Sequence, residues 1–178
     1  MIRKAVLPFV LAVTLATVAC STTWVAEAVN ILKVVAPAAV NILTLVAAFE
    51  GTPVDVQKSQ TITNDVNAAL KYLQDYSAAS AAAGPGVLAQ LDGALSATQN
   101  DLSSILATLH VVDKAHAAQI QALVTFVISE VAQVQSLIPP PPSTVIPIAR
   151  RTIPLSARKF KSSFNAMIKP ADASLVLK

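Results

Sequence analysis

Two histidines and an aspartate, His110, Asp113 and His116, are the residues whose types come closest to those of a metal site. Imidazole nitrogens and carboxylate oxygens are ligands that zinc prefers. In one continuous helix, however, the two histidines would point about 120° apart, and Val111-Val112 indicates a turn between them. Asp113 is better explained as the N-cap of a following helix, and His110 as a favourable group near the end of the preceding one. We therefore expect no bound metal ion and no other cofactor.

Sequence signatures of catalysis are missing as well. The chain contains no G-x-S-x-G, no phosphate-binding glycine loop and no H-E-x-x-H. Its acidic residues are scattered singly, which predicts no carboxylate pair for general acid–base catalysis. A single cysteine excludes both an intramolecular disulfide framework and a zinc–cysteine cluster. The sequence therefore predicts a protein that is not an enzyme.

The single cysteine, Cys20, follows a segment that has the three parts of a secretory signal. Arg3-Lys4 provides the positive start, residues 5–14 are apolar, and small residues lead up to the cysteine. The apolar stretch is too short to favour a membrane-spanning helix, which needs about 20 residues. Residues 1–19 are therefore predicted to be a signal peptide that is cleaved after Ala19.

The stretch Leu15-Ala16-Thr17-Val18-Ala19-Cys20 resembles the lipobox of bacterial lipoproteins. It departs from the usual pattern in having Thr17, rather than leucine, three places before the cysteine. The resemblance implies that fatty chains such as palmitate acylate the Cys20 thiol, that Cys20 becomes the mature N-terminus, and that the membrane is a partner through this lipid. Ser21, in place of an aspartate that retains some lipoproteins at the inner membrane, implies the outer membrane, on its periplasmic or surface face. The same signal without lipid predicts a secreted protein.

Charge is distributed unevenly along the chain. Residues 20–138 hold four lysines and nine acidic residues, a net charge of −5, whereas residues 139–178 hold seven basic residues and one acidic residue, a net charge of +6. The basic pI is thus a property of the two ends of the chain, and the part expected to fold is acidic and poor in charge. A surface of this kind suits a helical protein that packs against neighbours or works close to a membrane.

Residues 22–49 are expected to form the first helix of the mature chain. Apolar residues recur at alternating steps of three and four and cover most of its circumference, which predicts a central core helix, with insertion into a bilayer as the alternative. Pro37 should kink this helix or divide it in two. The second helix is expected from Pro53 to about Ala82, although the β-branched stretch 61–64 leaves open a later start.

Two further helices follow a Gly84-Pro85-Gly86 break, one ending near His110 and one running from the cap Asp113 to Ile138. Because short connections favour antiparallel neighbours, residues 20–138 are predicted to form an all-α, up-down four-helix bundle. An elongated helical hairpin or coiled coil is the alternative.

The last part of the chain divides into a proline-rich linker, residues 139–154, and a basic tail, residues 155–178. Three interpretations of the tail remain open: partial disorder, an amphipathic helix on an anionic surface, or docking onto the acidic bundle of the same molecule or its neighbour. The cations that would contact an anionic surface are Arg150, Arg151, Arg158, Lys159, Lys161 and Lys169.

These features favour a non-catalytic, lipid-anchored envelope protein that acts as a scaffold or interaction module. Its partner would be another protein or a second copy of the chain, and the compartment argues against nucleic acid. One alternative is a membrane-active or self-assembling protein in which helix 22–49 oligomerises or inserts, and another is a carrier of a small apolar ligand. Trp24 would rest at the membrane interface or in the core, and Tyr72 and Tyr76 are expected to pack.

Overall fold

The structure is a computed structural model that describes residues 6–79, 84–139 and 156–178, with backbone alone for residues 6–22. This part of the chain is all-α and contains no strand, which confirms the predicted fold class. The linker expected at 139–154 lies almost entirely outside the described residues. The elements are α1 (Val6–Glu50), α2 (Val56–Ala78), α3 (Gly84–Ala107), α4 (Lys114–Ser136), α5 (Ala157–Ile168) and a 3₁₀ turn, η1 (Ala173–Leu175).

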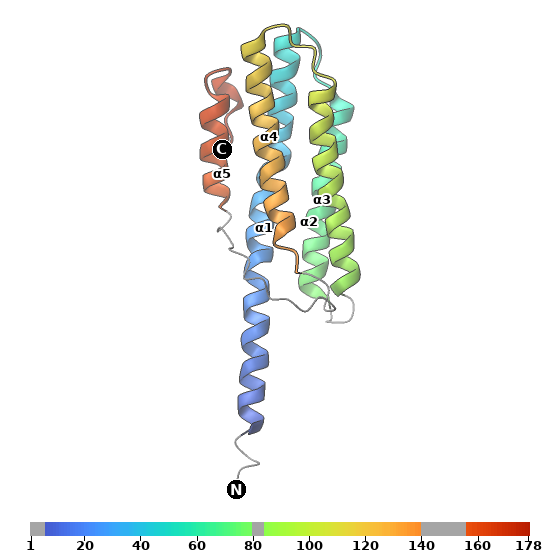
Figure 1. Cartoon of the computed structure of the whole chain (residues 1–178), viewed down its shortest axis with the longest axis vertical. Helices are drawn as coiled ribbons and strands as arrows, with labels where there is room; N and C mark the ends of the chain where they lie inside the picture. Colours follow the sequence, from blue (N-terminus) through green and yellow to red (C-terminus); the bar gives the residue numbers. More distant parts are fainter. Residues whose placement is uncertain (1–5, 80–83, 140–155) are drawn as a thin grey trace.

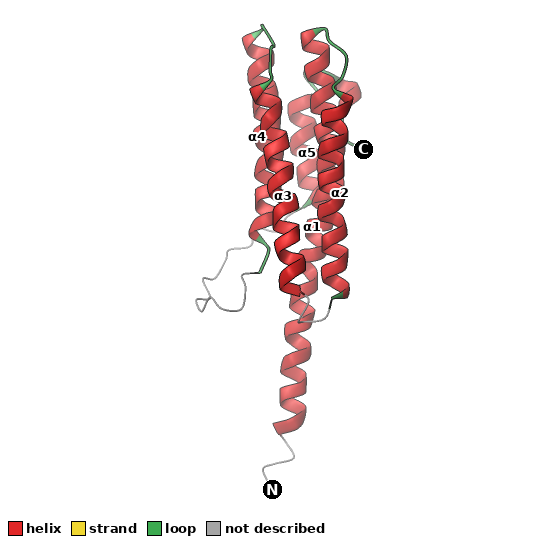
Figure 2. Ribbon diagram, turned by 90° about the vertical axis from the view of Figure 1, so that its right-hand side faces the viewer, coloured by secondary structure: helices red, strands yellow, loops and turns green. Residues whose placement is uncertain are grey.

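Helices α1 to α4 form an up-down bundle (Figure 1). Each packs against the next along the chain, and α4 returns to pack against α1, so the four helices surround one core. The loops 51–55 and 108–113 lie together at one end, which we call the distal end. The opposite end, the base, is where α1 extends beyond the other helices, as Figure 2 also shows. The elongated-hairpin alternative is therefore wrong.

Helix α1 is longer than the sequence predicted. It begins at Val6 instead of near residue 22, because Pro8 lies in the first turn, where a missing N–H is tolerated, and no further proline or glycine precedes Pro37. The division expected at Pro37 is also wrong, since the helix continues through this residue. The Pro37 ring is exposed, whereas Ala38 and Ala39 beside it are buried, so packing on both sides holds the helical path.

The other helix ends have local causes. Gly51 has a φ of 66°, a left-handed conformation that ends α1 at little steric cost. Helix α2 begins at Val56 because the Asp55 carboxylate accepts a 2.9 Å hydrogen bond from the Lys58 backbone N–H, so a start within 61–64 is wrong. Helix α3 ends at Ala107, three residues earlier than expected.

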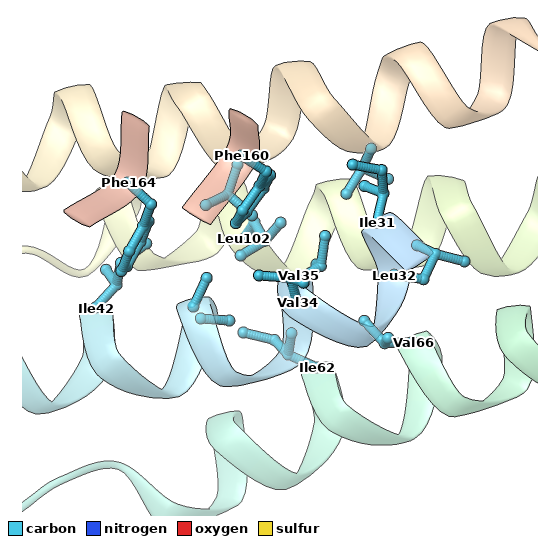
Figure 3. Close-up of a cluster of buried hydrophobic side chains, with 14 of the residues drawn as sticks. Ile31, Leu32, Val34, Val35, Ile42, Ile62, Val66, Leu102, Phe160 and Phe164 are labelled. Carbon is cyan, nitrogen blue, oxygen red and sulfur yellow. The ribbon is translucent and has the colours of Figure 1, made fainter. Parts of the chain in front are cut away.

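Helix α1 supplies the largest share of the core, and α2, α4 and α5 all pack against it. This explains why it is apolar around most of its circumference. Figure 3 shows its side chains meeting those of α2, α3 and α5 in one cluster. The labelled residues of the cluster are Ile31, Leu32, Val34, Val35, Ile42, Ile62, Val66, Leu102, Phe160 and Phe164.

Helix α5 packs in the groove between α1 and α4, which we call the α1–α4 groove. Phe160, Phe164 and Ile168 recur every four residues, and all three are buried there. The Phe160 ring lies 5.2 Å from the ring of Phe126 in α4. Of the three interpretations of the tail, the structure therefore shows docking onto the bundle of the same molecule.

Candidate functional site

The base of the bundle contains Cys20, the predicted lipidation site, within α1. Its side chain lies outside the described residues, as does everything in the chain before Val6. Among the residues of α1 whose side chains are described, which begin at Thr23, the first buried one is Val25. Figure 1 shows that the preceding part of α1 extends past the other helices. The projecting part of α1 thus comes from the N-terminal stretch that contains the predicted signal peptide.

Trp24, four residues after Cys20, packs against the C-terminal part of α2. Its ring centroid is 5.6 Å from that of Tyr76, with the rings tilted by 50°. The indole Nε1 is buried and has no hydrogen-bond partner among the described residues. Of the two predicted positions for Trp24, the structure shows a half-buried position at the edge of the core.

The distal end contains the three residues that were considered as metal ligands. The backbone N–H of His110 donates a 2.6 Å hydrogen bond to Glu50 Oε1, which ties the 108–113 loop to the end of α1. The His116 ring stacks on Phe49 at 3.9 Å, with only 11° between the planes. Asp113 Oδ1 accepts a 2.9 Å hydrogen bond from the His116 backbone N–H and caps α4, as predicted.

The electrostatics of Asp113 suit this capping role. The hydrogen bond from the His116 backbone N–H holds the pKa of the Asp113 carboxyl below its ordinary value, so the cap is ionised at neutral pH. His116 Nδ1 lies 3.7 Å from the same carboxylate, whereas the His110 ring nitrogen Nδ1 hydrogen-bonds to the Thr108 carbonyl. Within the described ranges, no three His, Cys, Asp or Glu side chains are placed to hold a metal ion.

A carboxyl pair that the sequence did not reveal lies on the seam between α2 and α3. Asp65 and Asp101 are half-buried and hydrogen-bonded to each other. Burial, then this hydrogen bond, then the negative charge of Asp101 raise the pKa of Asp65 to about 6. The expectation that no carboxylates would pair is therefore wrong. Each acid directly precedes a buried residue, Val66 or Leu102, and antiparallel pairing of the helices at this register brings the two acids together.

The same seam contains a cation that does not neutralise the pair. Lys58 Nζ donates to Thr108 Oγ1 at 2.9 Å and to the Ser104 carbonyl at 3.3 Å, further toward the distal end. Neither Asp65 nor Asp101 forms a salt bridge within the described part of the chain. The two carboxyls can share a proton, and the direct consequence of this is a stability that depends on pH.

A shallow groove of about 400 Å³ lies between the end of α3 and the start of α4. It opens on the outer surface near the distal end, whereas the carrier hypothesis expected a cavity within the bundle. Its lining is mostly aliphatic with one ammonium group. The lining residues are Leu106, Leu109, Lys114, Ala117, Ala118 and Gln121.

Of the predicted cationic residues, Arg158, Lys159 and Lys161 belong to α5, and Lys169 is the residue at its C-cap. Arg158, Lys159 and Lys169 are exposed, and Lys161 donates a 2.5 Å hydrogen bond to the backbone oxygen of Lys178. Arg150 and Arg151 lie outside the described residues. With the apolar face of α5 buried against the bundle, the exposed side of this helix consists mainly of polar and cationic residues.

Two segments of the described chain are long and apolar enough to cross a membrane by length and composition alone, Thr23–Glu50 and Lys114–Ser136. Core helices and signal sequences meet the same criterion, and more than half of the tested window in Thr23–Glu50 is buried in the bundle. Comparison of the chain with protein-family models, curated proteins and solved structures found no match.

Proposed function

We propose that this chain is a non-catalytic envelope protein, anchored through lipid on Cys20, whose bundle acts as a scaffold or interaction module. The observation that carries the proposal is at the base of the bundle, where the N-terminal part of α1 extends past the other helices (Figure 1) and leads into the lipobox-like stretch that ends at Cys20. Cleavage there would remove a segment that extends past the bundle and would leave every buried side chain of the described core in place.

The distance of α5 from Cys20 along the bundle determines which surface the exposed cations of α5 could contact. In Figure 3 the Phe164 side chain lies beside Ile42, and 22 residues of helix separate Ile42 from Cys20, a rise of about 33 Å. Arg158, nearly two turns earlier in α5, would then stand about 20–25 Å above the acylated residue if α1 is upright. Attraction between exposed charges is largely screened beyond about 8 Å at physiological salt. The docked cations thus suit a partner beside the bundle better than the lipid head groups beneath it.

The anchor is tested by expressing the full-length chain in a bacterial host and measuring the intact mass of the membrane-extracted protein. We expect a chain that begins at Cys20 and carries added acyl mass. In Cys20→Ser this mass should disappear and the protein should leave the membrane fraction, whereas the neighbouring Ser21→Ala should behave like the wild type. An unmodified thiol, or a retained Met1, would overturn the proposal.

A membrane-active protein is the second candidate, because Thr23–Glu50 meets the length and hydropathy of a membrane span. In this alternative α1 would leave the bundle and expose its apolar faces to lipid. The two candidates separate in a dye-release assay with liposomes of neutral and anionic lipid. A scaffold leaves the vesicles intact at every protein concentration, whereas insertion of α1 releases the dye in proportion to bound protein.

A further inference from the structure

We propose that the base of the bundle rests on the lipid head-group interface of a membrane, with Trp24 and Tyr76 as the aromatic contacts between the protein and neutral lipid. This inference rests on the lipid anchor of the proposed function, and it names the surface that the anchor holds against the membrane. It also gives the orientation of the molecule, in which α1 stands upright on the bilayer and the distal end points away from it.

The distance from Cys20 to the base is short. The backbone of α1 is one continuous helix from Val6 to Glu50, so Trp24 stands four helical residues, a rise of about 6 Å, beyond Cys20. Even if these four residues were fully extended, they would span at most about 14 Å. The polar head-group region is about 5–8 Å thick on each side of a bilayer. Acyl chains on Cys20 enter the hydrocarbon beneath that region, so the helical path holds Trp24 at the level of the head groups.

The aromatic side chains at this level come from two helices. The Trp24 ring in α1 and the Tyr76 ring in α2 are half-buried, with their centroids 5.6 Å apart. Tryptophan and tyrosine are enriched at membrane interfaces, because one end of each side chain is apolar and the other is polar. Helix α3 begins beside them, since a Cβ on Gly84 would lie 3.4 Å from Cε2 of Tyr76. Three helices therefore reach the same level, and contact at Trp24 brings the ends of α2 and α3 to the lipid as well when α1 is upright.

Among the described residues, the base has no charged side chain that would have to lose its hydration at this interface. In each helix of the bundle, the charged residue nearest the base is acidic and lies further toward the distal end. These residues are Glu27, Asp75, Asp92 and Glu130. Without a cation at the base, anionic lipid adds no attraction, and it would repel these acids within about 8 Å, the screening length at physiological salt. The base is therefore suited to neutral, zwitterionic lipid.

Two other modes of membrane contact predict different behaviour. Contact through the exposed cations of α5 would strengthen with anionic lipid. Insertion of α1 would bring the middle of this helix, at Pro37, into the hydrocarbon, whereas contact through the base leaves Pro37 about 26 Å from Cys20 along the helix axis and outside the lipid. Trp24 is the only tryptophan in the chain, so its fluorescence reports the depth of the base directly.

The test measures the quenching of Trp24 fluorescence in the full-length protein, extracted from bacterial membranes and reconstituted into vesicles of neutral phosphatidylcholine. The vesicles carry a nitroxide quencher either at the lipid head group or deep in the acyl chain, and flotation measures binding in the same samples. We expect the head-group nitroxide to quench Trp24 several-fold more strongly than the deep one. Replacing part of the neutral lipid with anionic phosphatidylglycerol should not increase the quenching.

Two variants in a Trp24→Phe background move the reporter to other positions. Tyr76→Trp keeps it at the base but on a different helix, so it should be quenched as in the wild type. Pro37→Trp, the matched control, places it at an exposed position further along α1, where neither nitroxide should quench it. The wild-type measurement itself needs no substitution, so it stands even if a variant fails to fold.

The outcomes separate the proposal from the anchor on which it rests. Vesicle-bound protein with an unquenched Trp24 would overturn the proposal and leave the anchor standing. Quenching of Pro37→Trp by the deep nitroxide would overturn it in favour of insertion, and quenching at position 24 without quenching at position 76 would overturn it because only α1 would then meet the lipid. Protein that does not float with the vesicles would overturn the proposal together with the anchor, which the intact mass of Cys20 tests separately.

Discussion

At the scale of single residues, several charged and polar side chains fix where helices begin and tie a loop to the bundle. Asp55 and Asp113 cap α2 and α4, and His110 ties a loop to Glu50. The exception is the pair formed by Asp65 and Asp101, in which two carboxyls meet without a cation among the described residues. Such a pair makes the stability of the bundle depend on pH.

The direction of this dependence follows from the pKa of Asp65, which is raised to about 6 in the folded chain from an ordinary value of 3.8. The native state therefore holds a proton between these values that the unfolded chain releases. The resulting stabilisation is complete below about pH 3.8 and is lost as the pH rises through 6. Asp65→Asn should thus raise the free energy of unfolding at pH 7. The gain should be at most about 1 kcal/mol because the pair is half exposed and screened by water.

Urea unfolding of wild type and Asp65→Asn at pH 4 and pH 7 checks this prediction. The variant should be the more stable protein at pH 7, and the difference should shrink at pH 4. Asp75→Asn is the control, since Asp75 pairs with Lys71 at 2.5 Å and its loss should bring no gain. Equal stability of Asp65→Asn and wild type at both pH values would show that the carboxyls do not interact in solution.

At the scale of elements, α1 and α5 are the two helices whose behaviour departs most from a simple four-helix bundle. Helix α1 is apolar on nearly all sides because α5 covers the side that α2 and α4 leave open. It also continues through Pro37, where one backbone hydrogen bond is necessarily missing. Its helical path at that point is therefore imposed by tertiary packing against local preference.

Replacing this proline gives the first prediction for α1. Pro37→Ala restores a backbone hydrogen bond and removes a ring that opposes the helix, and the site is exposed, so no packing is lost. We expect stabilisation by about 1–3 kcal/mol in denaturant unfolding. Lys33→Ala at another exposed position of α1 is the control, with an expected effect within about 0.5 kcal/mol. Destabilisation by Pro37→Ala would mean that the proline shapes α1 in a way that the packing needs.

Shortening one of the buried aromatic side chains of α5 gives the prediction for this helix. Phe164→Ala should weaken docking by about 3 kcal/mol or more, because the ring is fully buried between α1 and α4. Hydrogen exchange should then accelerate in residues 157–168 while protection in α2 and α3 stays close to wild type. Ser163→Ala, on the exposed side of the same turn, should leave the exchange of α5 unchanged. Uniform loss of protection across all helices would instead show that α5 and the bundle unfold as one unit.

At the scale of the whole molecule, the base of the bundle and the side covered by α5 differ in what they present to the surroundings. The base contains Cys20 and the projecting part of α1, and the acidic bundle rises from it with its cationic α5 along one side. A lipid anchor at the base would leave the α5 side and the distal end free to meet other proteins. The prediction at this scale concerns the removal of residues 1–19.

Deleting residues 1–19 should leave the bundle intact, because the N-terminal part of α1 extends past the other helices (Figure 1). We expect the thermal unfolding midpoint of the shortened chain to match that of full-length Cys20→Ser protein in the same detergent-containing buffer. Deleting residues 1–28 instead would remove Val25 and Ala28, and should lower the midpoint clearly. A drop caused by the first deletion alone would show that the N-terminal segment packs on the bundle.

Much of this architecture follows from the sequence by itself. The three-four spacing of apolar residues and the cap at Asp113 determine four amphipathic helices joined by short connections, because these signals are local. The break predicted at Gly84-Pro85-Gly86 is wrong in its position, since these residues form the first turn of α3. The apolar circumference of α1 likewise indicated a helix buried on several sides, which the structure confirms. The predictions concerning Cys20 and its lipid also come from the sequence, and they remain predictions.

Only the tertiary structure decided what depends on residues far apart in the chain. The pairing of Asp65 with Asp101 required the register between two antiparallel helices, and the docking of α5 required a groove formed by helices from opposite ends of the bundle. Local signals misplaced the start of α2, and they predicted a division at Pro37 that packing on both sides prevents. Spacing along a chain specifies the face of a helix, whereas the neighbour of that face is chosen by packing of the whole core.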